Sequence, residues 1–243
     1  MQLKRVFRIK NLAALILLLA FARARQKGDL QGLGKHLRSF SFRPYLTGLG
    51  FAVALVLISI FFLDQRVADF IVARRDLFWV RETARFGGLL GANSELWIIL
   101  SVAYMITSFM RVWDLVSKTI LGATLSNLLT SLVVQGMKFA FMRARPYSAE
   151  GPFSFFNLKG LWENAHAYQS LASGDVAVVA GAASYFFFAV RSRILRILIA
   201  LLPLATALQR VVDEKHWCSD TLAAMAVSLV VGHFIWSWRK IRI

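Results

Sequence analysis

Residues 115–146 read LVSKTILGATLSNLLTSLVVQGMKFAFMRARP, a run of mainly apolar and small residues followed by a short basic segment. A helix needs about 20 such residues to cross the hydrocarbon core of a bilayer, and this run is long enough. Lys138 and Arg145 lie where the helix would leave the membrane, and Pro146 stops it from continuing. The stretch therefore predicts a membrane-spanning helix with a cationic end.

Similar apolar runs recur along the chain, without an internal repeat or a linker between domains. The shorter runs reach spanning length when small or polar flanking residues extend the helix. We expect an all-α polytopic membrane protein in which a basic segment, residues 1–44, precedes a six-helix bundle, residues 45–243. The expected spans are residues 45–63, 96–110, 115–137, 176–190, 195–208 and 221–238.

The composition separates this chain from soluble proteins. It has 243 residues, of which 58% are hydrophobic and 17% charged, whereas soluble domains are about a quarter charged. Its net charge is +16. Such a charge would indicate nucleic-acid binding only if the chain formed a soluble fold with a basic surface. A membrane protein with a basic cytoplasmic side explains both features, so we expect no nucleic-acid partner. Cys218 is the only cysteine, which excludes an intramolecular disulfide.

The charge distribution predicts the orientation. If the N-terminus is cytoplasmic and six spans alternate, the inside segments hold 18 basic residues against Asp29 and Asp114, and the outside segments hold 11 of each sign. Lys and Arg favour the cytoplasmic side of a membrane. We therefore predict a multi-pass protein of the inner (plasma) membrane with both termini cytoplasmic. The cationic end of residues 115–146 then faces the periplasm or exterior.

Two further segments suggest helices at the membrane surface. Residues 11–22 have the shape of a signal peptide, but Arg23 and Arg25 follow with no clear cleavage site. We favour an uncleaved N-terminal interfacial helix, with a loosely attached tail as the alternative. In residues 64–94, apolar side chains alternate with arginines, which predicts amphipathic helices in the first outer loop. These helices either pack against the bundle or form a rim for an anionic head group.

Polar residues gather at three outer ends of the predicted spans. The first group is the segment after residue 137, and the second is residues 172–175, Ala-Ser-Gly-Asp, at the start of the fourth span. The third is residues 210–220, between the fifth and sixth spans. Ionisable residues at membrane depth are costly and are functional candidates. The topology therefore predicts one site at the outer face.

The residue types in these groups suit phosphate chemistry. Lys138 and Arg145 supply positive charge, and the guanidinium can form a bidentate fork with phosphate oxygens. Residues 173–174 are a helix start whose backbone N–H groups can bind an anion. His216 and Asp220 would share a helix face, so that the carboxylate could orient the imidazole and support positive charge on it. Such an imidazole can attack phosphorus and form a phosphohistidine.

The order and spacing of these residues resemble the type 2 phosphatidic acid phosphatase superfamily, whose signature is K-x6-R-P, P-S-G-H and S-R-x5-H-x3-D. The first part matches in full, the third with Gln209 in place of serine, and the resemblance covers most of residues 96–238. It implies His216 as the nucleophile and Asp220 as its partner, without metal or cofactor. The residues implied to hold the phosphate are Lys138, Arg145, Ser173, Gly174 and Arg210.

The second part of the signature departs from the family. Ala172 and Asp175 stand where the family has proline and histidine, and that histidine is thought to act as the general acid. An ordinary aspartate is ionised at pH 7 and could donate only if burial or a phosphate kept its proton. A diphosphate needs less protonation of its leaving group, which favours diphosphate substrates. His166 could supply the proton instead, or could be a solvated loop residue.

We therefore expect a membrane lipid phosphatase that removes a terminal phosphate from a lipid phosphate or diphosphate in the outer leaflet. The substrates that the resemblance implies are undecaprenyl diphosphate, phosphatidylglycerol phosphate, phosphatidic acid and lipid A phosphates, and the sequence does not choose among them. One alternative is a phosphotransferase that passes the phosphate to another lipid. A second, suggested by Asp175, is a non-catalytic protein that binds or transports anionic lipids.

Overall fold

The computed structural model describes residues 2–41, 43–91, 96–110, 113–158, 164 and 166–240. This part of the chain is helical and contains no strand, which confirms the all-α class. The α-helices are α1 (Gln2–Gln26), α2 (Leu33–Ser39), α3 (Leu46–Ile58), α4 (Asp64–Val72), α5 (Phe78–Gly91), α6 (Leu96–Ser108), α7 (Asp114–Phe141), α9 (Gly174–Ala189), α10 (Arg193–Val212) and α11 (Cys218–Arg239). A π-helix, η2 (Ser59–Leu63), joins α3 to α4, and the short 3₁₀ helices are η1 (Arg43–Tyr45) and η4 (Pro146–Ser148).

The helices that could cross a membrane fall into two classes. Among the described residues, four helical stretches are long and apolar enough: Arg43–Val72, Asp114–Ser148, Arg193–Val212 and Cys218–Arg239. The apolar helices α6 and α9 have 13 and 16 residues, or about 20 and 24 Å at 1.5 Å per residue. Both are shorter than the roughly 30 Å of a bilayer core. The described part of the chain thus has the helices of a membrane protein, four of them in stretches of spanning length.

The helix α9 lies at the centre of the bundle and packs against α7, α10 and α11. It approaches α7 closely at Gly181, where an added Cβ would lie 2.8 Å from the Cα atom of Asn127. Two buried hydrogen bonds join the helices there, from Ser126 Oγ to the Gly181 carbonyl and from Asn127 Nδ2 to the Val178 carbonyl, both 2.6 Å. Small residues and buried polar contacts of this kind hold helices together in lipid. They bring the start of α9 beside the end of α7.

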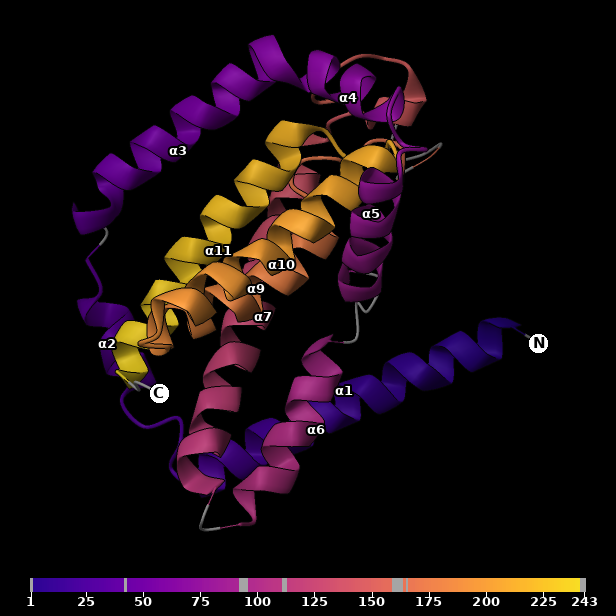
Figure 1. Ribbon diagram of the computed structural model, residues 1–243. Coiled ribbons are helices and arrows are strands. Elements are labelled where there is room, and N and C mark those ends of the chain that lie inside the picture. The colour runs from indigo at the N-terminus through magenta and orange to yellow at the C-terminus, as the bar shows by residue number, and fades with distance from the viewer. Residues whose placement is uncertain are drawn as a thin grey trace.

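Helix α5 packs along α10. The hydroxyl of Thr206 donates to the Gly87 carbonyl at 3.2 Å, and an added Cβ at Gly87 would overlap the Ala205 carbonyl. Figure 1 shows α5 descending beside α10 from the end of the bundle that carries α4. Of the two interpretations of residues 64–94, the structure therefore places α5 against the bundle.

Helix α1 includes residues 11–22 and lies across the opposite end of the bundle, near α6. Its end is tied to the junction of α6 and α7. The guanidinium of Arg23 donates to the Ser108 carbonyl at 3.2 Å, and the ammonium of Lys27 lies 3.2 Å from an Asp114 carboxylate oxygen. The end of α11 lies at this same end of the bundle.

Candidate active site

The first polar group follows the end of α7. The backbone turns at Met142, which has a φ of 41°, so that residues 143–145 leave the helix axis. The Arg145 N–H then donates to the Ala167 carbonyl at 2.8 Å, and the Ala144 N–H to the Ser154 carbonyl at 2.9 Å. These bonds fix the segment against the loop before α9. Lys138, in the last turn of α7, and Arg145 therefore lie at the same end of the bundle.

The second polar group begins α9, as predicted for residues 173–174. Ser173 is the N-cap residue, and its own N–H donates to the backbone carbonyl of Asp220 at 3.1 Å. At Gly174 an added Cβ would lie 2.9 Å from the ammonium nitrogen of Lys138. Glycine therefore leaves the room that the amine occupies at the helix start. The contact joins the first and second motifs.

The third polar group lies in the turn between α10 and α11. The backbone N–H groups of Lys215 and His216 both donate to the carbonyl of Arg210, at 3.0 and 3.2 Å, which folds the turn tightly. Arg210 Nη1 also lies 2.9 Å from a carboxylate oxygen of Asp175, at the start of α9. The structure thus gathers the three motifs at one end of the bundle. His166 is in the loop before α9 and is exposed to solvent.

The hydrogen bonds of His216 define which ring nitrogen can react. The imidazole is 2% exposed, and its Nδ1 lies 2.8 Å from the Ser170 carbonyl oxygen. A carbonyl only accepts, so Nδ1 carries the proton and Nε2 keeps its lone pair. Asp220 Oδ2 lies 3.8 Å from Nδ1, beyond hydrogen-bond distance. Ser170 links the two residues, because its hydroxyl donates to the same carboxylate oxygen.

The environment of His216 favours the neutral ring. Burial lowers its pKa from the ordinary value, and the nearby carboxylate of Asp220 opposes this shift. The positive charges of Arg145 and Lys138 act in the same direction as burial. An imidazole that is neutral at pH 7 can be a nucleophile.

Several buried donors at the site have no protein partner. Among the described residues, these are the Nε atoms of Arg145 and Arg210 and the hydroxyl of Ser173, one from each motif. Buried polar groups in native proteins are nearly always hydrogen-bonded, so unpartnered ones need an explanation. Guanidinium and hydroxyl donors of this kind suit an anion with several oxygens. In the described residues no group of three His, Cys, Asp or Glu side chains is arranged to hold a metal ion.

A buried ionic network that the sequence did not predict lies next to His216. Arg143 is fully buried and contacts the carboxylates of both Asp220 and Asp64, at 2.6 and 2.7 Å. Ser219 joins them through its hydroxyl, 2.6 Å from Arg143 Nη1 and 2.6 Å from Asp64 Oδ2. Arg143 lies inside the K-x6-R-P motif, but its spacing alone does not distinguish it from a membrane-boundary anchor. The other sequence feature that points to the network is Asp64, an ionisable residue at the end of the first apolar run.

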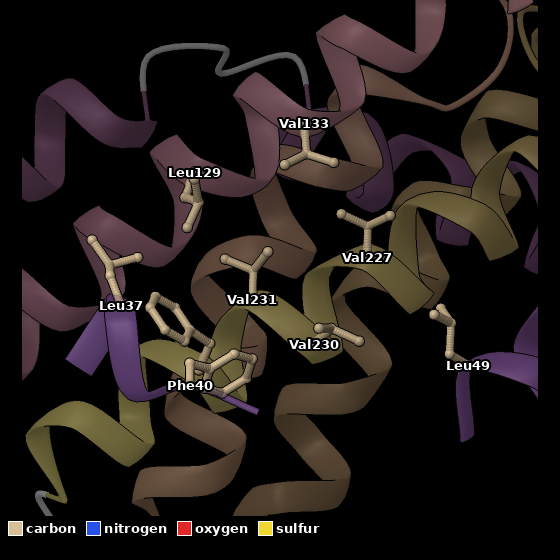
Figure 2. A pocket seen from close by; sticks show the side chains of 9 residues that line it. Leu37, Phe40, Leu49, Leu129, Val133, Val227, Val230 and Val231 are labelled. Carbon is tan, nitrogen blue, oxygen red and sulfur yellow. The ribbon is translucent and has the colours of Figure 1, made fainter. Parts of the chain in front are cut away.

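An apolar groove made of three cavities lies beside α3. Three cavities of about 380, 540 and 590 Å³ lie between α3 and the rest of the bundle, and Leu49 lines all three. No side chain of α3 is buried, and Figure 1 shows α3 bowed away from α11. Figure 2 shows the first cavity, which is lined by side chains of α7 and α11 and by Leu37, Phe40 and Leu49. The second cavity reaches Leu171, beside Ser170, and Phe155.

Together these features describe a helical membrane protein that has cationic side chains, unpartnered buried donors and a buried histidine at one end of the bundle. The family model described as the PAP2 superfamily matches residues 119–243, which contain all three motifs. The chain therefore belongs to the PAP2 superfamily, as its sequence predicted. Membership indicates phosphatase-type activity on phosphate esters. No curated protein and no solved structure matched the chain in the other two comparisons.

Proposed function

We propose that this protein is a membrane lipid phosphatase that works through a phosphohistidine at His216. The observation that carries the proposal is the set of buried donors without protein partners, Arg145 Nε, Ser173 Oγ and Arg210 Nε, beside a buried neutral imidazole. These donors, with Lys138, would hold three phosphate oxygens and stabilise the charge that develops on them in the transition state.

The reaction has two displacements. His216 Nε2 attacks phosphorus, the bond from phosphorus to the lipid oxygen breaks, and the lipid leaves with a proton from an acid or from water. The imidazole becomes positively charged as the P–N bond forms. The Ser170 carbonyl and the Asp220 carboxylate stabilise this positive charge. Water then attacks the phosphohistidine, releases inorganic phosphate and restores neutral His216. The first nucleophile and the groups that hold the phosphate are side chains and backbone of this chain, the second nucleophile is water, and the scheme uses no metal or cofactor.

The apolar groove supports a lipid as the substrate. Its outer end, at Leu171 and Phe155, lies next to residues that contact the site: Ser170 bonds His216, and the Phe155 ring centre is 4.9 Å from the Arg143 guanidinium. A hydrocarbon chain in the groove would bury apolar surface while its phosphate lies among the cations. A water-soluble phosphate ester would make no use of the groove. Acyl and polyprenyl lipids present the same phosphate chemistry, so both belong to the proposed class of substrate.

The ion pair between Asp175 and Arg210 supports a positioning role for Asp175. A carboxylate oxygen of Asp175 lies 2.9 Å from Arg210 Nη1, and this contact can hold the guanidinium in place. We therefore infer that Asp175 orients Arg210, and proton donation by Asp175 or His166 is the second candidate. Asp175→Asn should then slow hydrolysis of a monoester and a diphosphate about equally. A loss confined to the monoester would assign the acid to Asp175, and an inactive His166→Ala beside an active Asp175→Asn would assign it to the loop.

We also propose the predicted topology: six crossings in the inner (plasma) membrane, both termini cytoplasmic and the site at the periplasmic or outer face. The site and the end of α11 lie at opposite ends of the bundle, which supports it. A cysteine at Ser154 in a Cys218→Ser background should react with an impermeant thiol reagent in intact cells, and one at Ser192 should not. The reverse labelling would overturn the orientation.

The function is tested by phosphate release in detergent from lipid monophosphates, lipid diphosphates and a water-soluble phosphate ester. We expect release from at least one lipid, negligible release from the soluble ester, and loss of turnover by many orders of magnitude in His216→Ala. Acid-labile, alkali-stable phosphate trapped on the wild type should be absent from this variant. Near-normal hydrolysis by His216→Ala would refute the mechanism. Transfer of phosphate to a second lipid would indicate a phosphotransferase, and binding without turnover a lipid-binding protein.

A further inference from the structure

The buried network around Arg143 connects the first part of the chain to the site. Asp64 begins α4, outside the residues that match the family, and is 1% exposed. Its Oδ1 accepts hydrogen bonds from the Ser59 hydroxyl at 3.0 Å and the Ser219 N–H at 2.8 Å. Its Oδ2 accepts from Arg143 Nη2 and from the Ser219 hydroxyl. Both oxygens of the carboxylate are therefore hydrogen-bonded, and two of the partners, Arg143 and Ser219, adjoin Asp220.

Arg143 joins Asp64 to Asp220, the partner of His216. Its Nη1 donates to Asp220 Oδ1 at 2.6 Å, while its Nη2 and Nε donate to the Pro152 carbonyl at 2.7 and 3.0 Å. The other Asp220 oxygen accepts from the Trp217 N–H and the Ser170 hydroxyl. The Ser170 carbonyl accepts from His216 Nδ1. A continuous chain of hydrogen bonds thus joins Asp64 to His216.

A stabilising role alone is a weak explanation for this network. Burying charges is costly, and well-packed apolar residues in place of a buried ion network often leave stability unchanged or higher. Here the carboxylates of Asp64 and Asp220 share the one guanidinium of Arg143, so the formal charge of the three groups together is negative. That charge lies on the side of His216 where its Nδ1 is bonded, and it favours the positive imidazole that forms when Nε2 attacks phosphorus.

We propose that Asp64 is a positioning residue of this site: through Arg143 it fixes the Asp220 carboxylate and leaves that carboxylate the negative charge that supports His216. The proposal rests on His216 being the nucleophile. Without Asp64, the guanidinium charge would act on Asp220 alone and reduce its support for positive charge on the imidazole. Asp64 does not touch the phosphate, so its loss should act on kcat and leave KM nearly unchanged.

The decisive comparison uses Asp64→Asn, which removes the charge but keeps the shape, and Arg143→Lys, which keeps the charge but loses the planar fork. Both should lower kcat about 10- to 100-fold, as when outer partners of a functional side chain are removed. Only Asp64→Asn should also move the acid limb of kcat/KM to lower pH, by about half a unit or more. Asp29→Asn, a matched buried carboxylate bonded to Tyr104 at the opposite end of the bundle, should change neither quantity.

The other charges around His216 are common to all these variants, so the shift can be assigned to Asp64. These charges belong to Lys138 on α7, Arg145 in the segment after it, Asp175 on α9, Arg210 on α10 and Asp220 on α11. The titration of His216 by NMR in wild type and Asp64→Asn reports the same shift without turnover. His216→Asn identifies its signal among the four histidines. This measurement decides the proposal even if no lipid is hydrolysed.

The outcomes separate positioning from simple stabilisation. A lower melting temperature in Asp64→Asn with wild-type kcat and wild-type titration of His216 would overturn the proposal. If Asp64→Asn does not fold, Ser219→Ala removes one hydroxyl of the network without changing charge, and Arg143→Lys tests the fork. Wild-type kcat in both of these variants would also overturn it. Reduced kcat with unchanged KM and an unchanged acid limb in both would support it.

Discussion

The arginines at this site are of two kinds: Arg143 has protein acceptors for every guanidinium nitrogen, whereas Arg145 and Arg210, in the part of the chain that the structure describes, do not. All three nitrogens of the Arg143 guanidinium donate to protein acceptors. Arg145 and Arg210 each keep a buried Nε without a partner among the described residues. A buried cation with all its donors engaged fixes the chain, whereas one with unused donors can bind a ligand. From this difference we expect Arg143 to hold the architecture of the site, whereas Arg145 and Arg210 are the arginines that we propose for phosphate binding.

The largest expected effect tests the first half of this comparison. Arg143→Gln leaves the carboxylates of Asp64 and Asp220 buried without a cation. Breaking a buried ion pair in this way costs about 3–5 kcal/mol of stability. We expect a clear fall in melting temperature, measured in detergent without substrate. Arg145→Gln, which breaks no ion pair among the described residues, is the matched variant, and an equal fall in both would contradict the distinction.

The second effect should be on catalysis instead of stability. Arg210→Gln or Arg145→Gln should cost about 2–4 kcal/mol of transition-state stabilisation, or about 30- to 1000-fold in kcat/KM. The reason is that donors aimed at the phosphate oxygens are lost while the fold keeps its contacts. Steady-state kinetics with the best lipid of the panel measures the loss. Wild-type kcat/KM in either variant would remove that arginine from the phosphate site.

A smaller effect is expected where the first two motifs meet. Gly174→Ala places a Cβ 2.9 Å from the Lys138 ammonium nitrogen and must displace it. A small displacement of a phosphate ligand should lower kcat/KM about 10- to 100-fold. Gly136→Ala is the matched change in α7, because nothing lies within 4 Å of its added Cβ. It should leave the kinetics unchanged, and a similar loss in both variants would point to a general effect on the helices.

The smallest effect concerns pH in the unaltered protein. Burial lowers the pKa of His216, so the ring stays neutral to a pH below its ordinary value of about 6.5. Activity should be lost as pH falls through this lowered pKa, and the acid limb of kcat/KM should lie below pH 6.5. An acid limb at or above pH 6.5 would mean that the Asp220 carboxylate outweighs burial. The Arg143 network would then act more strongly on His216 than its geometry indicates.

The sequence predicted the helical membrane class and the PAP2 superfamily, because both depend on local properties: apolar runs long enough for a bilayer and fixed spacings such as K-x6-R-P. The sequence predicts less well where each helix begins and ends. Residues 96–108 and 174–189 form helices of 13 and 16 residues. Four helical stretches of spanning length lie in the part of the chain that the structure describes, and the count of six spans stays a prediction. Hydropathy alone does not show where packing and turns end a helix.

Only the tertiary structure could show which charged residues meet. Arg143 lies 79 residues from Asp64 and 77 from Asp220 in the chain, yet it contacts both. The sequence offered Arg143 as one more cation beside Arg145, since the two differ by only two positions. The αL turn at Met142 and the buried position of Arg143 separate their roles. Spacing determines which residues can belong to a motif, but the burial of a charge requires an opposite charge nearby, and that partner comes from a distant segment brought close by folding.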